Sequence, residues 1–480
     1  MARNAPRPFW IALERSQGGL ESQLYAGLRD QILAGTIAGG HKLPSTRELA
    51  VTLGISRATV VSAFDRLKAE GYLETRKGSA TRVSMLPPAI NGAVKVQAQR
   101  QVPATRTLSD PRLLKPGAPD LEAFPRAEWA SALASRARSL RDGDLDYRDE
   151  TGLPELKEAI IEHVTATRGV NAEPDQVVIV PTARAAIDLV AGEIFKSIPV
   201  DQQEAWIEEP GYWAAQGILK SIVSKLVPVP CDADGLDPLA APAGHPKLIY
   251  TTPSHQYPTG VSMSLERRLS LLALAERTGA IIIEDDYDSE FHQGPQAMPS
   301  LQGIDRSGSV VYLGTFSKLL APAIRVGYMI VPRAILELVS SGHRRKGLAV
   351  SLYVQAALST MMKDGRTRAH LRRVRPLYAE RMAATVRALT AHCGGYLRVG
   401  DGRDGLQLTT WFIDPQADDV SIARALQDEG YGVRPLSPFF LGSARPGLLF
   451  GISSVDVGSI DRQAQVVAQA IGQRVAGKPR

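Results

Sequence analysis

A lysine, an aspartate, a tyrosine and an arginine in this sequence are the residue types that could carry chemistry on an amine. Lys318 ends the run GTFSK, directly after the apolar residues 310–313, and Asp285 lies in the run EDDY, after the apolar residues 280–283. A lysine can form a Schiff base with an aldehyde cofactor, and a carboxylate can keep a pyridine nitrogen protonated. Tyr212 could stack on such a ring, and Arg325 could bind its phosphate. Together these residue types suit pyridoxal 5'-phosphate (PLP).

Taken singly, each of these residues has a simpler explanation. A lysine after a strand is frequent by chance, and a lone carboxylate there is commonly a helix cap or part of a structural ion pair. The elements that position the residues decide between the two. Short β-rich runs at 177–180, 205–207, 247–250, 280–283 and 310–313 alternate with helical patterns such as 185–195 and 265–277. We therefore expect an α/β fold around a mostly parallel sheet, in which ligands bind beyond the carboxyl ends of the strands.

The N-terminal residues predict a different, smaller fold. Leucine and isoleucine recur one turn apart over 20–32, which predicts a first helix ending near Gly35. Pro44-Ser45-Thr46 reads as the N-cap of a second helix that ends at Gly54, and Ile55-Ser56 as the cap of a third. Two helices joined by a short turn with glycine make a helix-turn-helix. The alternating runs 72–76 and 80–83 around Lys77-Gly78-Ser79 predict a small hairpin with a basic tip, which is a wing.

The charge of the chain is unevenly distributed. The formal net charge is +6 over 480 residues, but residues 1–85 carry +5 and residues 86–112 carry +3, so that the remainder carries −2. Residues 84–111 contain proline pairs and no sustained period, as a linker does. We therefore expect a DNA-binding domain over 1–84, a linker over 85–111 and a large α/β domain over 112–480.

Composition excludes several other classes of protein. No run approaches the roughly 18 consecutive apolar residues of a membrane span, and the first thirty residues do not resemble a signal peptide, so we expect a cytoplasmic protein. The two cysteines, Cys231 and Cys393, are too few for a disulfide framework and lie in no zinc spacing. We expect no metal site.

Residues 43–73, LPSTRELAVTLGISRATVVSAFDRLKAEGYL, resemble the GntR winged-helix family, whose pattern is LPSxRxLAxxLGxSRxTVxxAYxxLxxEGxL. The resemblance implies that the head binds double-stranded operator DNA. It implies DNA contacts at Arg47, Ser56, Arg57 and Thr59, with Lys77 and Gly78 at the wing tip. Ala80 stands where the family often has a second wing glycine.

The large domain resembles the class I, fold-type I aminotransferases, through EPGY at 209–212, TPSHQYPTG at 252–260, EDDYDSEF at 284–291 and TFSKLLAPAIRVGY at 315–328. A GntR-like head joined to these motifs looks like the MocR subfamily, in which an aminotransferase-like domain senses the effector of a transcription factor. By that resemblance Lys318 forms the Schiff base with PLP, and the other residues are its binding site. The implied roles are the pyridine nitrogen for Asp285, the ring hydroxyl for Tyr287, ring stacking for Tyr212, the phosphate for Arg325, Thr315 and Ser317, and the cofactor face for His255 beside Gln256.

The sequence departs from the aminotransferase pattern in two places. The phosphate-binding turn, which usually reads like SGTQQALDL, is PTARAAIDL at 181–189, without the glycine and both glutamines. The strand that reads like LRLGF in aminotransferases, with the arginine that binds the substrate carboxylate, is LLFGI at 448–452. Arg434 and Arg445 flank that strand and are candidates to bind an effector carboxylate, although a solvated surface role is the simpler reading of each.

These observations predict a PLP-binding transcriptional regulator, expected as a homodimer, whose operator affinity changes when an amino compound or PLP itself is sensed. An alternative is an active PLP-dependent aminotransferase with an appended DNA-binding head; the lysine, aspartate and tyrosine favour it and the absent carboxylate arginine opposes it. A third reading, motivated by the altered turn at 181–185, is a regulator that no longer binds PLP. The sequence does not choose the effector, the promoter, or activation over repression.

Overall fold

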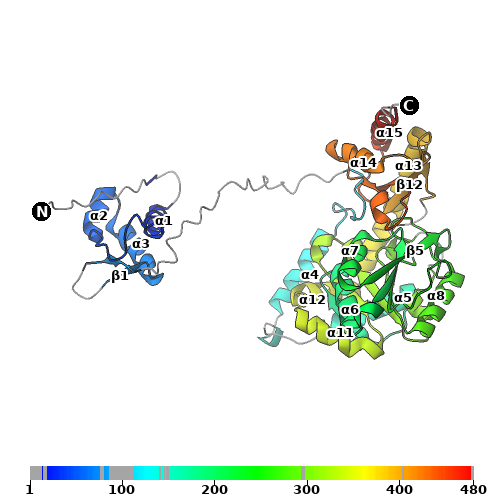
Figure 1. Ribbon diagram of the computed structural model, residues 1–480, viewed down its shortest axis with the longest axis horizontal. Coiled ribbons are helices and arrows are strands. Elements are labelled where there is room, and N and C mark those ends of the chain that lie inside the picture. Colours follow the sequence, from blue (N-terminus) through cyan, green and yellow to red (C-terminus); the bar gives the residue numbers. More distant parts are fainter. Residues whose placement is uncertain are drawn as a thin grey trace. The chain divides into compact units, whose positions relative to one another are not determined.

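The computed structural model of the chain describes residues 13–14, 19–75, 80–85, 113–139, 142–144, 146, 151–292, 298–402 and 405–476. The chain divides into two compact units, Met1–Ser109 and Asp110–Arg480 (Figure 1). The boundary between them falls inside the segment predicted as a linker. Among the described helices, none combines the length and the apolar character that crossing a bilayer requires.

The first unit is a three-helix head with a short hairpin. Ser45 forms a capping box with Glu48 at the start of the second helix, and Gly54 ends that helix in a left-handed conformation. Ser56 caps the third helix by accepting a hydrogen bond from the Thr59 N–H. Both caps stand where the sequence predicts them. The helices are α1 (Leu20–Leu33), α2 (Thr46–Leu53) and α3 (Arg57–Ala69).

A small apolar core holds the head together. Leu24 and Leu28 of α1 pack on Val60 and Phe64 of α3, and all four are essentially buried. The hairpin strands β1 (Leu73–Glu74) and β2 (Arg82–Val83) pair antiparallel and are two residues each, shorter than the predicted runs. The predicted wing tip, Lys77 and Gly78, lies outside the described residues.

The second unit is built around an eight-stranded sheet of order β3-β10-β9-β8-β7-β4-β5-β6. The pairs β8·β9, β7·β8, β4·β7 and β4·β5 are parallel, whereas β10 and β6 run antiparallel to their neighbours. The predicted α/β fold with a mostly parallel sheet is confirmed. The strands are β3 (Val177–Val180), β4 (Glu204–Glu209), β5 (Lys225–Asp232), β6 (Gly235–Leu236), β7 (Leu248–Thr251), β8 (Ile281–Asp285), β9 (Val310–Thr315) and β10 (Gly327–Ile330).

Helices cover both faces of this sheet, as the continuous apolar strands require. One apolar cluster joins the sheet to Ile187 of α6, Leu219 of α7 and Val339 of α11, and a second joins the opposite face to Leu271 of α8. The helices of this layer are α6 (Ala183–Phe195), α7 (Trp213–Ile222), α8 (Leu265–Thr278), α9 (Leu301–Ile304), α10 (Phe316–Leu319) and α11 (Arg333–Lys346).

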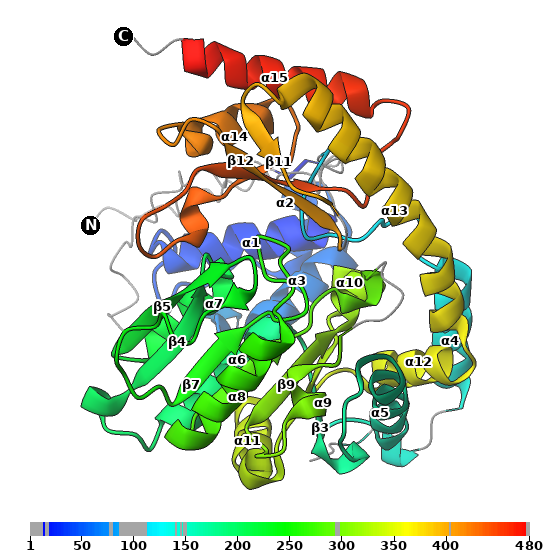
Figure 2. The same ribbon diagram turned by 90° about the vertical axis from the view of Figure 1, so that its right-hand side faces the viewer.

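A second, antiparallel sheet of order β11-β12-β14-β13 forms a small subdomain with α14 and α15, which Figure 2 shows beyond one end of the large sheet. The long helix α13 connects the two parts and packs on α15. The sequence interpretation did not identify this sheet. The remaining elements are β11 (Leu397–Val399), β12 (Gln407–Phe412), β13 (Arg434–Pro435), β14 (Gly447–Gly451), α4 (Arg126–Arg138), α5 (Pro154–Arg168), α12 (Leu352–Lys363), α13 (Arg366–Cys393), α14 (Asp419–Asp428) and α15 (Ile460–Ala476).

Candidate functional site

A cavity of about 400 Å³ lies at the carboxyl ends of the parallel strands. Asp285 is the last residue of β8, Thr315 the last residue of β9, and Lys318 follows in α10. Of the eight residues predicted to bind the cofactor, the cavity brings together seven, namely Lys318, Asp285, Tyr287, Tyr212, Arg325, Thr315 and Ser317. It is also lined by Gly117, Thr182, Ala183, Arg184, Tyr250, Thr252, Tyr257 and Gln407.

The amine of Lys318 is the nucleophile of the cavity. Thr315 caps the short helix α10 by accepting a hydrogen bond of 3.1 Å from the Ser317 N–H, which fixes where the lysine leaves the backbone. The Lys318 Nζ donates to the carbonyl oxygen of Gly117. Burial lowers the pKa of Lys318, although Asp288 and Asp285 oppose this shift. A lowered pKa increases the neutral fraction of the amine, which is the form that attacks a carbonyl.

Asp285 presents a carboxylate oxygen that nothing else in the described structure uses. The side chain is buried, and its Oδ2 accepts a hydrogen bond of 2.7 Å from Tyr250 Oη. Its Oδ1 is buried and has no hydrogen-bond partner among the described residues. Burial raises the pKa of Asp285 to about 7. A buried acceptor without a donor costs stability unless a ligand supplies one, and the protonated pyridine nitrogen of PLP is such a donor.

The hydrogen-bond partners of Tyr287 leave its hydroxyl available as a donor to a ligand. His255 Nδ1 lies 2.9 Å from the carboxylate of Asp288, which can only accept, so this nitrogen carries a hydrogen. The same nitrogen lies 3.1 Å from Tyr287 Oη and, because it carries a hydrogen, cannot accept from the tyrosine, while Gln407 Nε2 donates to Tyr287 Oη at 3.0 Å. Burial raises the pKa of Tyr287, so the phenol stays protonated. Its hydrogen has no acceptor among the described residues and suits the ring hydroxyl oxygen of PLP.

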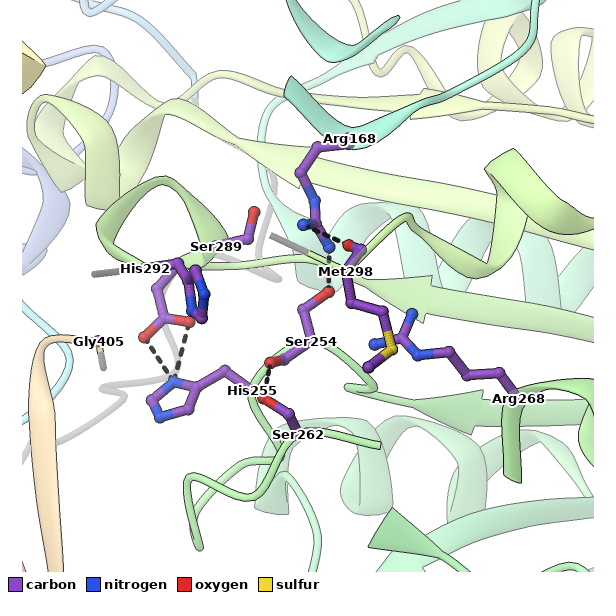
Figure 3. Close-up of a pocket in the computed structure, with 10 residues that line it drawn as sticks. Arg168, Ser254, His255, Ser262, Arg268, Ser289, His292, Met298 and Gly405 are labelled. Carbon is purple, nitrogen blue, oxygen red and sulfur yellow. Dashed lines mark hydrogen bonds and ion pairs between the residues drawn. The ribbon is translucent and has the colours of Figure 1, made fainter. Parts of the chain in front are cut away.

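His255 does not line this cavity but borders a second one of about 160 Å³ (Figure 3). Its Nδ1 lies 2.9 Å from the Asp288 carboxylate. Figure 3 shows Arg168 bonded to Ser254 in the same pocket. Arg168 also forms a buried ion pair of 2.8 Å with Asp286. His255 contacts Tyr287, which lines the cofactor cavity, and the prediction that His255 lies at the cofactor face stays a prediction.

The N-terminus of α6 and Arg325 both border the cavity. Thr182 caps α6, and the first residues of the helix, Ala183 and Arg184, line the cavity in place of the absent glycine. Helix N-termini favour anions. Arg325 adopts a left-handed conformation with φ of 56°, and its guanidinium is exposed without a side-chain partner among the described residues. A cation placed beside a helix N-terminus is suited to a phosphate.

Aromatic rings enclose the middle of the cavity. Tyr257 lies edge-on to both Tyr212 and Tyr287, with ring centroids 5.6 and 5.7 Å apart. Arg184 Nε lies 3.3 Å from Tyr212 Oη and holds the ring from the phosphate side. These contacts fix the orientation of Tyr212, so that it could stack on a planar ligand.

The strand that carries a carboxylate-binding arginine in aminotransferases is apolar here. Leu449, which stands where LRLGF has its arginine, is fully buried in a cluster with Leu436, Phe439 and Tyr257. Arg434 of β13 is the cross-strand partner of Leu449, and partners in a sheet project from the same face. Arg434 lowers the pKa of Lys318 without lining the cavity, whereas Arg445 stacks over Trp411 at 4.5 Å.

On the head, the predicted DNA contacts Ser56, Arg57 and Thr59 lie at the start of α3, and Arg47 lies in the first turn of α2. Arg47, Ser56 and Arg57 are exposed, and neither guanidinium has a side-chain partner among the described residues. The Ser56 hydroxyl also bonds to Thr59 Oγ1 at 2.8 Å. Ser56 and Thr59 therefore organise the start of α3, with Arg57 projecting from its first turn.

Sequence reasoning missed three residues of the site. Tyr250 binds Asp285, Asp288 binds His255, and Gln407 binds Tyr287. Asp288 stands in the quoted run EDDYDSEF, and Tyr250 ends a predicted strand, so both lay within reach of the sequence. Gln407 had no signal, because the sheet that carries it was not recognised.

Two families match the two units. The model of bacterial regulatory proteins of the gntR family matches residues 20–83, and that of aminotransferase class I and II matches residues 115–449. The chain is 39% identical over 452 residues to the probable rhizopine catabolism regulatory protein MocR of Rhizobium meliloti, covering 91% of this chain and 90% of that protein. It is 31% identical to the pyridoxine biosynthesis regulator PdxR of Corynebacterium glutamicum, covering 91% and 92%.

Solved structures agree with this assignment for the large unit. A kynurenine aminotransferase of Pyrococcus horikoshii superposes with a TM-score of 0.69 at 23% identity, covering 77% of this chain and 92% of that one. The α-aminoadipate aminotransferase LysN of Thermus thermophilus gives 0.67 at 26%, covering 76% and 93%. The chain belongs to the MocR-type members of the GntR family, transcriptional regulators in which a helix-turn-helix head is joined to an aminotransferase-like domain.

Proposed function

We propose that this regulator binds PLP in the cavity between Lys318 and Asp285, and that an amino compound, or PLP itself, changes its affinity for operator DNA by occupying that cavity. The observation that carries the proposal is the unpaired, buried Oδ1 of Asp285, in the same cavity as a buried amine. Bound PLP offers an electrophilic carbon to amines, which is the chemistry that sensing an amino compound requires.

Each part of the cavity has a role in this proposal. Asp285 binds the pyridine nitrogen, Tyr287 donates to the ring hydroxyl, and Tyr212 stacks on the ring. Arg325, with the hydroxyls of Thr315 and Ser317 and the first N–H groups of α6, binds the phosphate. The altered sequence at 181–185 raises the question of what binds the phosphate. The N-terminus of α6 still offers N–H groups for it, because backbone N–H groups do not depend on the side chains of the turn.

The effector end of the cavity argues for sensing more than for turnover. Because Leu449 is packed in an apolar cluster, no arginine fixes a carboxylate at the position that aminotransferases use. Arg434 projects from the adjacent strand and is the candidate contact for an anionic group of the effector, with Arg445 the weaker candidate on its tryptophan. A substrate held in another position loses the orientation on which catalysis depends.

The head would bind the operator DNA. Arg57 and the N-terminus of α3 would meet bases and phosphates in the major groove, and Arg47 would meet the backbone, with Lys77 and Gly78 of the wing beside it. A homodimer would read two half-sites. An effector can alter operator affinity only by as much as it prefers one conformation over the other, typically 5- to 150-fold.

An aminotransferase that carries a DNA-binding head is the second candidate. It is favoured by the complete lysine, aspartate and tyrosine set in one cavity. The apolar environment of Leu449 opposes it, because substrate anchoring is the part of the enzyme that is absent.

Absorbance and footprinting separate these functions. Purified protein with PLP should show a visible band that borohydride abolishes and that a Lys318→Ala variant lacks. Lys363→Ala, which removes an exposed lysine paired with Glu158, is the matched control and should keep the band. No visible band after PLP addition contradicts the cofactor assignment. Rapid turnover of an amino donor, with no protected operator next to the gene itself, supports the aminotransferase instead.

A further inference from the structure

Gln407 ties the small subdomain to the cofactor cavity. It is the first residue of β12 and is 5% exposed. Its Nε2 donates to Tyr287 Oη at 3.0 Å, across the boundary between the two sheets. Its Oε1 is buried and has no partner among the described residues.

The unpaired oxygen shows that the amide is not present for packing. An apolar side chain of the same shape would fill this position without burying an unsatisfied acceptor, which carries a free-energy penalty. The amide offers two groups that an apolar residue lacks, namely the N–H that reaches Tyr287 and an unpaired oxygen on a residue that lines the cavity. The N–H is the group whose partner the structure shows.

We propose that Gln407 is a positioning residue that directs the Tyr287 hydroxyl hydrogen toward the ring hydroxyl of PLP, so that the small subdomain tunes the cofactor. This inference rests on the proposed PLP site. Gln407 donates to the Tyr287 oxygen, and the hydrogen-bearing Nδ1 of His255 beside it cannot accept from the hydroxyl. The Tyr287 hydrogen is therefore left to point into the cavity.

The sign of the effect follows from the hydrogen bond. Donation by Tyr287 stabilises the deprotonated form of the ring hydroxyl oxygen, which shares a proton with the Lys318 nitrogen. Donation into the Tyr287 oxygen by Gln407 strengthens that effect, because linked hydrogen bonds polarise one another. Removing the amide should therefore raise the pH at which the visible absorbance of bound PLP titrates.

Other charges around Lys318 and Tyr287 stay constant in the test. The groups that face them, from the strand ends, from the 255–257 loop, from α6 and from the small sheet, are Asp285, Asp288, His255, Tyr257, Arg184 and Arg434. A change of titration in a Gln407 variant that keeps all of them comes from the amide.

The test titrates the visible absorbance of the PLP-loaded full chain in two variants. Gln407→Met keeps the unbranched shape and removes the N–H, and we expect its midpoint to rise by roughly 0.5 to 1 pH unit. Thr409→Val is the matched control, because Thr409 lies one pleat further along β12 and donates to the Pro258 carbonyl oxygen at 2.5 Å. It removes a bond between the same two parts without touching Tyr287, and its midpoint should not move.

Combining variants distinguishes positioning from a structural role. In a Tyr287→Phe background, Gln407→Met should produce no further shift, because its effect passes through the phenol. An unchanged midpoint in Gln407→Met, an equal shift in Thr409→Val, or full additivity with Tyr287→Phe overturns the inference while the visible band of the parent leaves the PLP site intact. If Gln407→Met does not take up PLP, Gln407→Leu, which is also uncharged and lacks the N–H, is titrated with the same expectations. If the parent protein shows no band, the proposed function fails first.

Discussion

Replacing Asp285 with asparagine should stabilise the PLP-free protein and weaken its binding of PLP. Asparagine keeps an acceptor for Tyr250 Oη and removes the buried charge. Because burial raises the pKa of Asp285 to about 7, the folded state holds this proton more tightly than the unfolded state, where the pKa is about 3.9. Unfolding between these two values releases a proton, so stability falls as the pH rises from about 4 to 7 and stays low above.

The environment of Asp285 sets the size of the change in stability and of the change in PLP affinity. The shift of about three pH units corresponds to up to about 4 kcal/mol of lost stability at pH 8, which Asp285→Asn would recover. At pH 5 the gap between the variant and the parent should shrink to about a third. In the presence of PLP, the loss of a hydrogen bond to a charged group, about 1.5 to 3 kcal/mol, should weaken binding by about 10- to 150-fold.

Asp286 provides the matched control, because it is the adjacent buried carboxylate. Its Oδ2 pairs with Arg168 Nε at 2.8 Å and accepts from Tyr312 Oη at 2.6 Å. Asp286→Asn leaves the arginine without its partner and should destabilise the protein by about 3 to 5 kcal/mol. Calorimetric unfolding at pH 8 and pH 5, together with PLP titration, measures all of these quantities. An Asp285→Asn protein no more stable than the parent at pH 8, or one with unchanged PLP affinity, would refute the role of Asp285.

Three further predictions concern the phosphate end and the head. Arg325→Met should weaken PLP binding roughly 10- to 100-fold without lowering the unfolding temperature, because the guanidinium has no described side-chain partner to lose; a stability loss without an affinity loss would contradict this. Arg57→Ala should weaken operator binding by about 1 to 3 kcal/mol if it reads a base, or less with a reduced salt slope if it meets phosphate, and an unchanged gel shift at controlled salt counts against both. Ser56→Ala should lower the stability of the head by about 1 kcal/mol through the lost cap, measured by denaturant unfolding; no loss would show that the cap is not formed in solution.

In the head, the helix ends could be predicted because they depend on single capping residues, whereas the strand ends could not. Ser45, Gly54 and Ser56 are caps whose preference is written into single residues, and the structure uses each of them at the expected position. The hairpin was predicted too long because alternation of residue types extends beyond the pairing that two short strands can make. Strand ends are set by tertiary pairing, which a single sequence does not display.

In the large unit, too, some elements could be predicted from the sequence and others could not. Apolar runs such as 280–283 and 310–313 identified central strands, since strands buried on both faces need no alternation. The small sheet was missed because β11 and β13 are three and two residues long. Residues near the strand ends, such as Asp285 and Lys318, could be predicted to meet at one edge, whereas the contact of Gln407 with Tyr287 depends on how two sheets pack and has no counterpart in sequence spacing.

Leu449 has a consequence for how this protein would bind ordinary amino acids. In every common amino acid the carboxylate and the amine are attached to the same carbon. An arginine at position 449 would bind the carboxylate of such a compound. In this protein the arginine nearby in the sheet is Arg434, the cross-strand partner of Leu449. If the proposed effector site is correct, an α-amino acid would find no arginine at position 449 for its carboxylate, and a compound whose anionic group reaches Arg434 would be bound in preference to it.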